Sequence, residues 1–153
     1  MYSERRILFV CTGNLCRSPM AEYLFRHLMK DDGEWECSSA GTAAWAGQPA
    51  SDQAIVALAE WDIDLTPHRS RCLSPALIDS AEWILVMTDA HRRDIANYYP
   101  QSVDRIKGLG IFDSRVPGNE IGDPIGASLD VYRGVRDQIQ RCLYDLVLFL
   151  KGK

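Results

Sequence analysis

The sequence lacks the features that would assign the protein to a membrane, a nucleic acid or a secretory route. No apolar run reaches the length of a transmembrane span, and the N-terminus shows no signal-peptide pattern. The formal net charge is −4 and no run of basic residues occurs, which argues against nucleic acid or an anionic membrane surface as the main partner. We therefore expect a cytoplasmic protein that neither binds nucleic acid nor inserts into a membrane.

The cysteine pattern is not that of a disulfide framework or a zinc site. The chain has five cysteines, an odd number. Cys11 and Cys16 are spaced C-x4-C, and His68 and Cys72 are spaced H-x3-C. Structural zinc sites use more closely paired ligands, and the first pair here lies beside Arg17. We expect reduced thiols and no metal.

The composition and the apolar pattern predict a single α/β domain over residues 1–153. Hydrophobic residues make up 46% of the chain and charged residues 25%, as in ordinary globular proteins. Strand and helix patterns alternate, which predicts a parallel sheet covered by helices on both faces. The expected strands are 7–10, 35–39, 83–87 and 106–109, and the expected helices are 18–30, 50–61, 74–80, 89–98 and 128–150.

An eight-residue loop, reading Cys-Thr-Gly-Asn-Leu-Cys-Arg-Ser at 11–18, joins the first expected strand to the first helix. Ser18 suits the N-cap of that helix and Pro19 its first position. Inward-pointing backbone N–H groups and the positive helix N-terminus would make this loop an anion site. Gly13 permits a left-handed backbone and Asn14 tolerates one.

The loop also carries side chains suited to phosphoryl chemistry. Arg17 can hold two phosphate oxygens with its guanidinium fork. Cys11 stands at the start of the loop, where the same positive field favours the thiolate over the thiol. The alternative is a tight turn with an inert, buried cysteine.

The pattern Cys-(x)5-Arg-Ser is the signature of cysteine-dependent phosphatases, and the longer string at 10–22 closely resembles the low-molecular-weight protein tyrosine phosphatases of bacteria. The resemblance runs over nearly the whole chain and is strongest at 7–25. It implies a flavodoxin-like three-layer sandwich with four parallel strands in the order 2-1-3-4. It also implies a hydrolase that needs no cofactor.

The resemblance assigns the catalytic roles. Cys11 is the nucleophile and Arg17 the phosphate clamp. Asp123, in the only Asp-Pro pair of the chain, is the acid that protonates the leaving oxygen and then the base that activates water. Pro124 restricts the backbone of Asp123, although the pair alone would also suit an ordinary turn. The remaining loop residues and the bracing residues implied by the family are Thr12, Gly13, Asn14, Leu15, Cys16, Ser18, Ser39 and His68.

Three residues match the family's walls around the phosphotyrosine ring. Leu15 and Trp45 are apolar and suited to a flat ring, although a loop tryptophan is also often a half-buried packing residue. Ile125 stands where the family usually has an aromatic residue after Asp-Pro. Cys16 matches the family's second loop cysteine and suits a reversible disulfide with Cys11, or else a small packing role.

The expected substrate is a phosphotyrosine protein, with a bacterial tyrosine kinase among the partners and a monomer or weak dimer as the assembly. The segment 123–128 also resembles a branch that contains protein arginine phosphatases, but that branch has threonine in place of Leu15. Leucine cannot orient water or a guanidinium group, which favours phosphotyrosine. Arsenate reductase needs shuttle cysteines that are absent from 73–141. A non-catalytic phosphate-binding or redox module is a further alternative.

Overall fold

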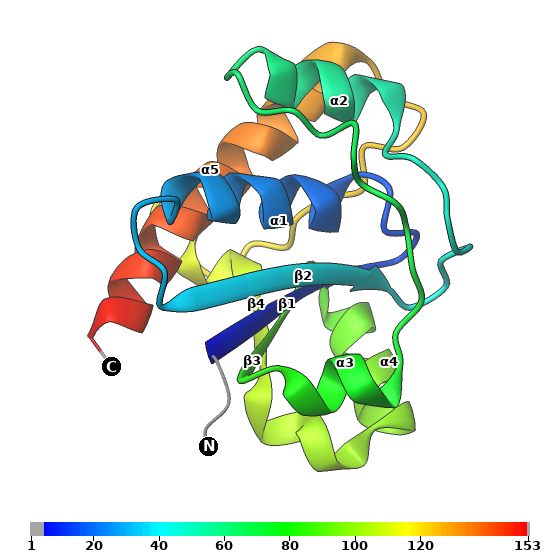
Figure 1. The fold of residues 1–153 in the computed structure, drawn as a ribbon, viewed down its shortest axis with the longest axis vertical. Coiled ribbons are helices and arrows are strands. Elements are labelled where there is room, and N and C mark those ends of the chain that lie inside the picture. Colours follow the sequence, from blue (N-terminus) through cyan, green and yellow to red (C-terminus); the bar gives the residue numbers. More distant parts are fainter. Residues whose placement is uncertain (1–4, 153) are drawn as a thin grey trace.

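A four-stranded parallel sheet forms the centre of the computed structural model, which describes residues 5–152 (Figure 1). The strand order is β2-β1-β3-β4, as the family resemblance implied. All neighbouring strands pair in parallel. The strands are β1 (Arg5–Cys11), β2 (Trp35–Gly41), β3 (Trp83–Val86) and β4 (Ile106–Gly108).

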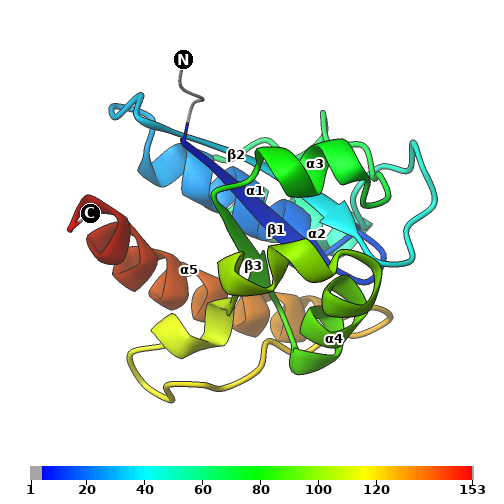
Figure 2. The same cartoon turned by 90° about the horizontal axis from the view of Figure 1, so that it is seen from below.

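Helices cover both faces of this sheet, as predicted (Figures 1 and 2). One face carries α1 (Arg17–Leu28), α2 (Asp52–Ala59) and α5 (Leu129–Lys151), and the other carries α3 (Pro75–Ser80) and α4 (Asp89–Tyr98). Two short 3₁₀ helices, Pro100–Arg105 and Leu109–Phe112, flank β4. Within the described part of the chain, no helix is both long enough and apolar enough to cross a bilayer.

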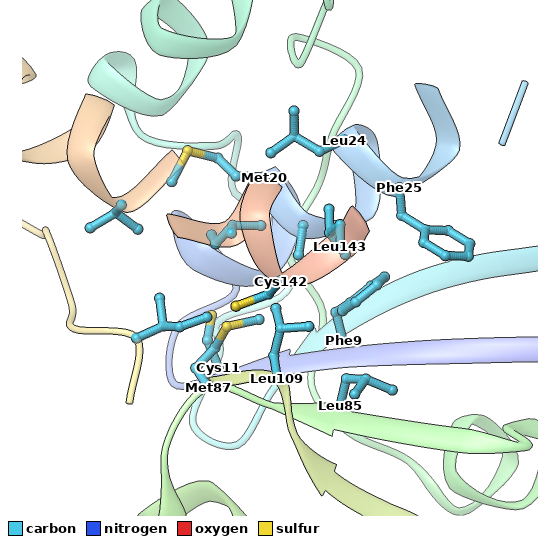
Figure 3. Close-up of a cluster of buried hydrophobic side chains, with 14 of the residues drawn as sticks. Phe9, Cys11, Met20, Leu24, Phe25, Leu85, Met87, Leu109, Cys142 and Leu143 are labelled. Carbon is cyan, nitrogen blue, oxygen red and sulfur yellow. The ribbon is translucent and has the colours of Figure 1, made fainter. Parts of the chain in front are cut away.

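The central strand β1 is buried on both faces because its side chains alternate between two cores. Ile7 and Phe9 belong to the larger core with α1 and α5, and Leu8 and Val10 belong to the smaller core with α3 and α4. All four side chains are fully buried. Figure 3 shows part of the larger core, with labelled side chains that come from β1, β3, α1 and α5. A strand covered on both faces has to be apolar at successive positions, which explains its uninterrupted hydrophobic run.

The predicted cap of the first helix is wrong. Helix α1 begins at Arg17 with Cys16 in the N-cap position, so Ser18 lies inside the first turn rather than capping it. Pro19 is then the third helical residue, which is tolerated because the N–H groups of the first turn have no intrahelical partner. Ser51 does occupy the N-cap position of α2, but its side chain makes no capping hydrogen bond. The buried hydroxyl of Ser18 serves the loop instead.

The absence of a side chain at Gly41 allows the end of β2 to touch the loop that follows β1. Cys11 and Gly41 are paired in register across the two strands. A Cβ atom on Gly41 would lie 2.4 Å from the carbonyl oxygen of Thr12 and 3.1 Å from the backbone nitrogen of Asn14. Both contacts are with backbone atoms, which cannot rotate away. Glycine at this position therefore permits the close packing of the two strand ends.

A buried carboxylate fixes the start of the long loop before α5. Asp113 is fully buried, and its Oδ1 atom accepts hydrogen bonds from the backbone nitrogens of Arg115 (2.9 Å) and Val116 (3.3 Å). Arg141 and Gln138 of α5 donate to the same carboxylate. These hydrogen bonds outweigh the desolvation of the carboxylate and lower its pKa to about 2. Asp113 thus ties the loop to the last helix.

We predict that Asp113→Asn lowers the free energy of unfolding by about 2 kcal/mol, because the charge-assisted bonds from Arg141 are lost. Urea denaturation measures this change, and Asp31→Asn in an exposed turn is the matched control. Because the folded pKa of Asp113 lies below that of the unfolded chain, its stabilisation is present above about pH 4 and is lost as the pH falls towards 2. Equal stability of the two variants near neutral pH would contradict this role.

Candidate active site

The predicted loop lies at the carboxyl end of β1 and lines a small cavity. The cavity has a volume of about 170 Å³. It brings together the predicted nucleophile, phosphate clamp and acid, together with two of the predicted apolar walls. Its lining residues are Cys11, Thr12, Gly13, Leu15, Cys16, Arg17, Asp123 and Ile125.

Cys11 sits against a hydrogen-bond donor at the bottom of this loop. Its Sγ atom lies 2.9 Å from Ser18 Oγ, and only 2% of the residue is exposed. Ser18 Oγ also accepts a hydrogen bond of 2.8 Å from Asn14 Nδ2, so the hydroxyl proton is free to point at the sulfur. The donated hydrogen bond presents a positive partial charge to the sulfur, and the N-terminus of α1 adds another. Both effects suit Cys11 to nucleophilic attack.

Asn14, rather than Gly13, adopts the left-handed backbone that the sequence allowed at either position. Asn14 has φ = 58°, whereas Gly13 does not have a positive φ. The side chain of Asn14 is fully buried and donates to Ser18 and Ser39, while its Oδ1 atom accepts from the backbone nitrogen of Arg71. These contacts hold the strained conformation in place.

The two predicted bracing residues both contact Asn14. Ser39 on β2 accepts from Asn14 Nδ2 at 3.0 Å and donates to Glu22 of α1 at 2.6 Å. His68 donates from Nε2 to the carbonyl oxygen of Asn14 at 2.8 Å. Burial lowers the pKa of His68 below its usual value, although the hydrogen bond to Asn14 opposes this shift. The loop is therefore supported from β2 and from the segment after α2.

Arg17 is buried beneath the cavity with one N–H group unused by the protein. Its Nη1 atom donates to the carbonyl oxygen of Ile121 at 3.0 Å, and its Nη2 atom lies 3.5 Å from Asp123 Oδ2. Its Nε atom is buried and has no hydrogen-bond partner among the described residues. Since a buried donor without an acceptor is costly, this N–H suits an oxyanion bound in the cavity.

Asp123 is held over the cavity by its own loop. Its side chain is 45% exposed, and Oδ1 accepts a hydrogen bond from the backbone nitrogen of Ile125. The loop is joined to the end of β3 by a 3.0 Å bond from the Ile121 nitrogen to the Met87 carbonyl. In addition, Glu120 Oε2 accepts a hydrogen bond of 2.6 Å from the backbone nitrogen of Asp89, the first residue of α4. A partly exposed carboxylate at the mouth of the cavity can exchange protons with both substrate and water.

The three predicted wall residues do not all meet at the cavity. Leu15 and Ile125 line it, and Ile125 is 56% exposed at its rim. Trp45 lies outside the set of lining residues, on the loop after β2, with 82% of its surface exposed. The side chain is not a packing residue in this structure, and its role as a wall stays a prediction.

Cys16 also lines the cavity and has two hydroxyl neighbours that the sequence did not suggest. Its Sγ atom is 3.3 Å from Ser51 Oγ and 3.3 Å from the hydroxyl oxygen of Tyr132. Burial raises the pKa of Cys16 and raises that of Tyr132 to about 12. Cys16 is thus a thiol at neutral pH. Ser51 and Tyr132 lie 35 and 116 residues away along the chain, so no local pattern reveals these contacts.

Another residue missed from the sequence is His91, which holds the start of the loop. The Thr88 backbone nitrogen donates to its Nδ1 atom at 3.1 Å, so the proton is on Nε2, which donates to Thr12 Oγ1 at 2.8 Å. Burial, followed by the nearby Arg17 charge, lowers the pKa of His91 to about 4. Thr88 and His91 form the capping box of α4, and the T-x-x-H spacing was the available signal.

No group of three or more potential metal ligands gathers anywhere in residues 5–152. The residues of the H-x3-C pair are engaged separately: His68 bonds to the loop, and Cys72 donates to the carbonyl oxygen of Ala44 at 2.6 Å.

Comparisons with known proteins agree with this geometry. A protein arginine phosphatase of Bacillus subtilis is 38% identical over 146 residues, covering 95% of this chain and 96% of that protein. The structure of the arginine phosphatase YwlE from Geobacillus stearothermophilus matches 97% of this chain and 94% of its own, with a TM-score of 0.89 and 39% identity. The structure of a low molecular weight protein tyrosine phosphatase from T. tengcongensis matches 95% of this chain and 99% of its own, with a TM-score of 0.89 and 36% identity.

The family model described as low molecular weight phosphotyrosine protein phosphatase matches residues 6–153. That span includes the whole of the loop, its bracing residues and the Asp-Pro pair. The chain therefore belongs to the low molecular weight phosphotyrosine protein phosphatase family.

Proposed function

We propose that the protein hydrolyses phosphotyrosine in proteins through a cysteinyl-phosphate intermediate. The observation that carries the proposal is the placement of the Cys11 sulfur, the Arg17 guanidinium and the Asp123 carboxylate around one cavity of about 170 Å³. A nucleophile, a fixed cation and a proton donor in one cavity are what phosphoryl transfer to a thiolate requires.

In the first step, the Cys11 thiolate attacks phosphorus in line with the tyrosyl oxygen. The S–P bond forms as the P–O bond breaks, and Asp123 gives its proton to the departing oxygen, so that neutral tyrosine leaves. Arg17 and the loop amides hold the three equatorial oxygens, whose charge they stabilise in the transition state. The hydrogen bond from Ser18 to the sulfur weakens as the sulfur loses its negative charge.

In the second step, Asp123, now a carboxylate, takes a proton from a water molecule, whose oxygen attacks phosphorus. The S–P bond breaks, inorganic phosphate leaves, and Cys11 returns as a thiolate. The hydrogen bond from Ser18 stabilises that leaving group. One carboxylate thus serves both steps, in keeping with Asp123 as the acidic residue among the described residues that line the cavity.

The apolar walls support phosphotyrosine as the substrate. Leu15 and Ile125 present hydrocarbon to the cavity, which suits a phenyl ring better than a guanidinium group. Phosphoarginine is the second candidate, because relatives named protein arginine phosphatases are 38% and 42% identical to this chain. Two relatives named low molecular weight protein-tyrosine-phosphatases are 32% and 35% identical over similar lengths.

The position of Cys16 beside Cys11 supports a role for Cys16 in protecting the nucleophile from over-oxidation. We propose that a peroxide oxidises the Cys11 thiolate to a sulfenic acid, which the Cys16 sulfur attacks to form a disulfide with release of water. Because burial raises the pKa of Cys16, it does not compete with Cys11 for substrate in the reduced enzyme. A cellular thiol would restore both residues.

The role of Asp123 predicts a dependence on the leaving group. Asp123→Ala should slow hydrolysis of a phosphotyrosine peptide by about 100-fold or more, because tyrosine leaves poorly without a proton. It should slow release of an acidic phenol from an aryl phosphate much less, since that phenolate leaves unaided. Steady-state kcat values on both substrates measure the difference, and equal losses would argue against Asp123 as the acid.

The substrate class is tested by assaying phosphotyrosine and phosphoarginine versions of one peptide with the wild type and with Leu15→Thr. We expect the wild type to prefer phosphotyrosine, and the threonine hydroxyl to shift the ratio of kcat/KM values towards phosphoarginine. A wild-type preference for phosphoarginine would replace phosphotyrosine in this proposal. Failure to hydrolyse either peptide or an aryl phosphate would exclude a phosphatase.

A further inference from the structure

A second and larger cavity opens beside the catalytic one. Its volume is about 750 Å³, and it shares Thr12, Arg17 and Asp123 with the catalytic cavity. Its remaining walls come from the segment after β2, from the two residues 72–73 before α3, from α4 with its two flanks, and from the loop before α5. These segments lie around the same end of the sheet (Figure 2). We name this space the flanking groove.

The flanking groove is negatively charged. Asp94 and Glu120 lie in its walls and are exposed, and neither forms an ion pair within residues 5–152. Asp123 adds a third carboxyl group, which is neutral while it holds the proton for the leaving oxygen. The cation in the wall is Arg17, which faces Asp123 and the phosphate position. His91 is neutral, because burial and Arg17 lower its pKa to about 4. Once a phosphoryl group occupies Arg17, the charge that remains is acidic.

Apolar surface accompanies these carboxylates. Ala43 lies in the wall formed by the segment after β2, and Leu73 lies in the wall formed by the residues before α3. Tyr98 and Tyr99 lie in the wall at the end of α4. Tyr98 is 80% exposed, so its ring is accessible from the groove. A lysine or arginine side chain combines a hydrocarbon stem with a charged end, and it matches a wall of this mixed kind.

We propose that the flanking groove binds the polypeptide next to the phosphorylated residue and selects lysine or arginine there. The inference rests on the proposed function, because the substrate chain has to leave the catalytic cavity at its rim. The groove begins at that rim, at Asp123 and Thr12. Opposite charge across the contact favours basic neighbours over neutral or acidic ones.

The test compares phosphopeptides that differ at one position, with lysine, glutamine or glutamate on either side of the phosphorylated residue. For the wild type we expect kcat/KM to be about threefold higher with lysine than with glutamine at low ionic strength, on at least one side. High salt should reduce the difference, because exposed charges are screened. Glutamate should give the lowest value.

Asp94 is the residue to change, because it is exposed, lies outside the catalytic cavity and makes no ion pair with the described residues. Asp94→Asn should bring the lysine and glutamine peptides closer together, and Asp94→Lys should favour glutamate. Asp31→Asn removes the same charge from the exposed turn after α1 and should preserve the wild-type preference. Hydrolysis of a small aryl phosphate should be unchanged in all three variants.

The outcomes separate this proposal from the one it rests on. Equal kcat/KM values for all wild-type peptides, or a lysine preference that survives Asp94→Lys, would overturn the flanking groove while aryl phosphate hydrolysis upheld the phosphatase. Loss of activity on every phosphorylated substrate in the folded wild type would overturn the proposed function itself. A preference inverted by Asp94→Lys establishes the groove as the contact.

Discussion

The hydrogen bond between Ser18 and Cys11 is the contact on which the site depends. A thiolate in a nearly closed position needs a compensating donor, and the Ser18 hydroxyl lies 2.9 Å from the sulfur. That hydroxyl is oriented because Asn14 donates to its oxygen, and Asn14 is itself fixed by Ser39, Arg71 and His68. The network around Asn14 thus serves the chemistry of the site, because it leaves the hydroxyl proton of Ser18 free to be donated to the Cys11 sulfur.

The parallel sheet explains why distant segments meet around this contact. Strands β1, β2 and β3 all end at the same edge, so the segments that follow them lie together there. Gly41 allows the end of β2 to approach the backbone of Thr12. The carbonyl oxygen of Met87, after β3, accepts a hydrogen bond from the backbone nitrogen of Ile121, in the loop that carries Asp123. Arg17 bonds to the same Ile121. Arg17, the proposed phosphate clamp, therefore also fixes the segment that carries Asp123.

The sequence was sufficient for the features that are contiguous or periodic. The loop at 11–18 is one motif, and the alternation of strands and helices predicts the layers and, with the family resemblance, the strand order. Helix α1 starts one residue before Ser18 because that hydroxyl is used by Cys11 and Asn14 instead of a cap. The contacts of Tyr132 and Ser51 with Cys16 depend on how α5 and α2 pack, which no local pattern encodes.

Trapping of the covalent intermediate tests the proposed mechanism most directly. Rapid acid quenching of the wild type during turnover of an aryl phosphate, followed by mass spectrometry, should find one phosphoryl group on the peptide that contains Cys11. The same reaction should show a burst of phenol stoichiometric with enzyme, and Cys11→Ser should show no turnover. Phosphate release by Cys11→Ser at the wild-type rate, with no adduct on the wild type, would contradict the central claim.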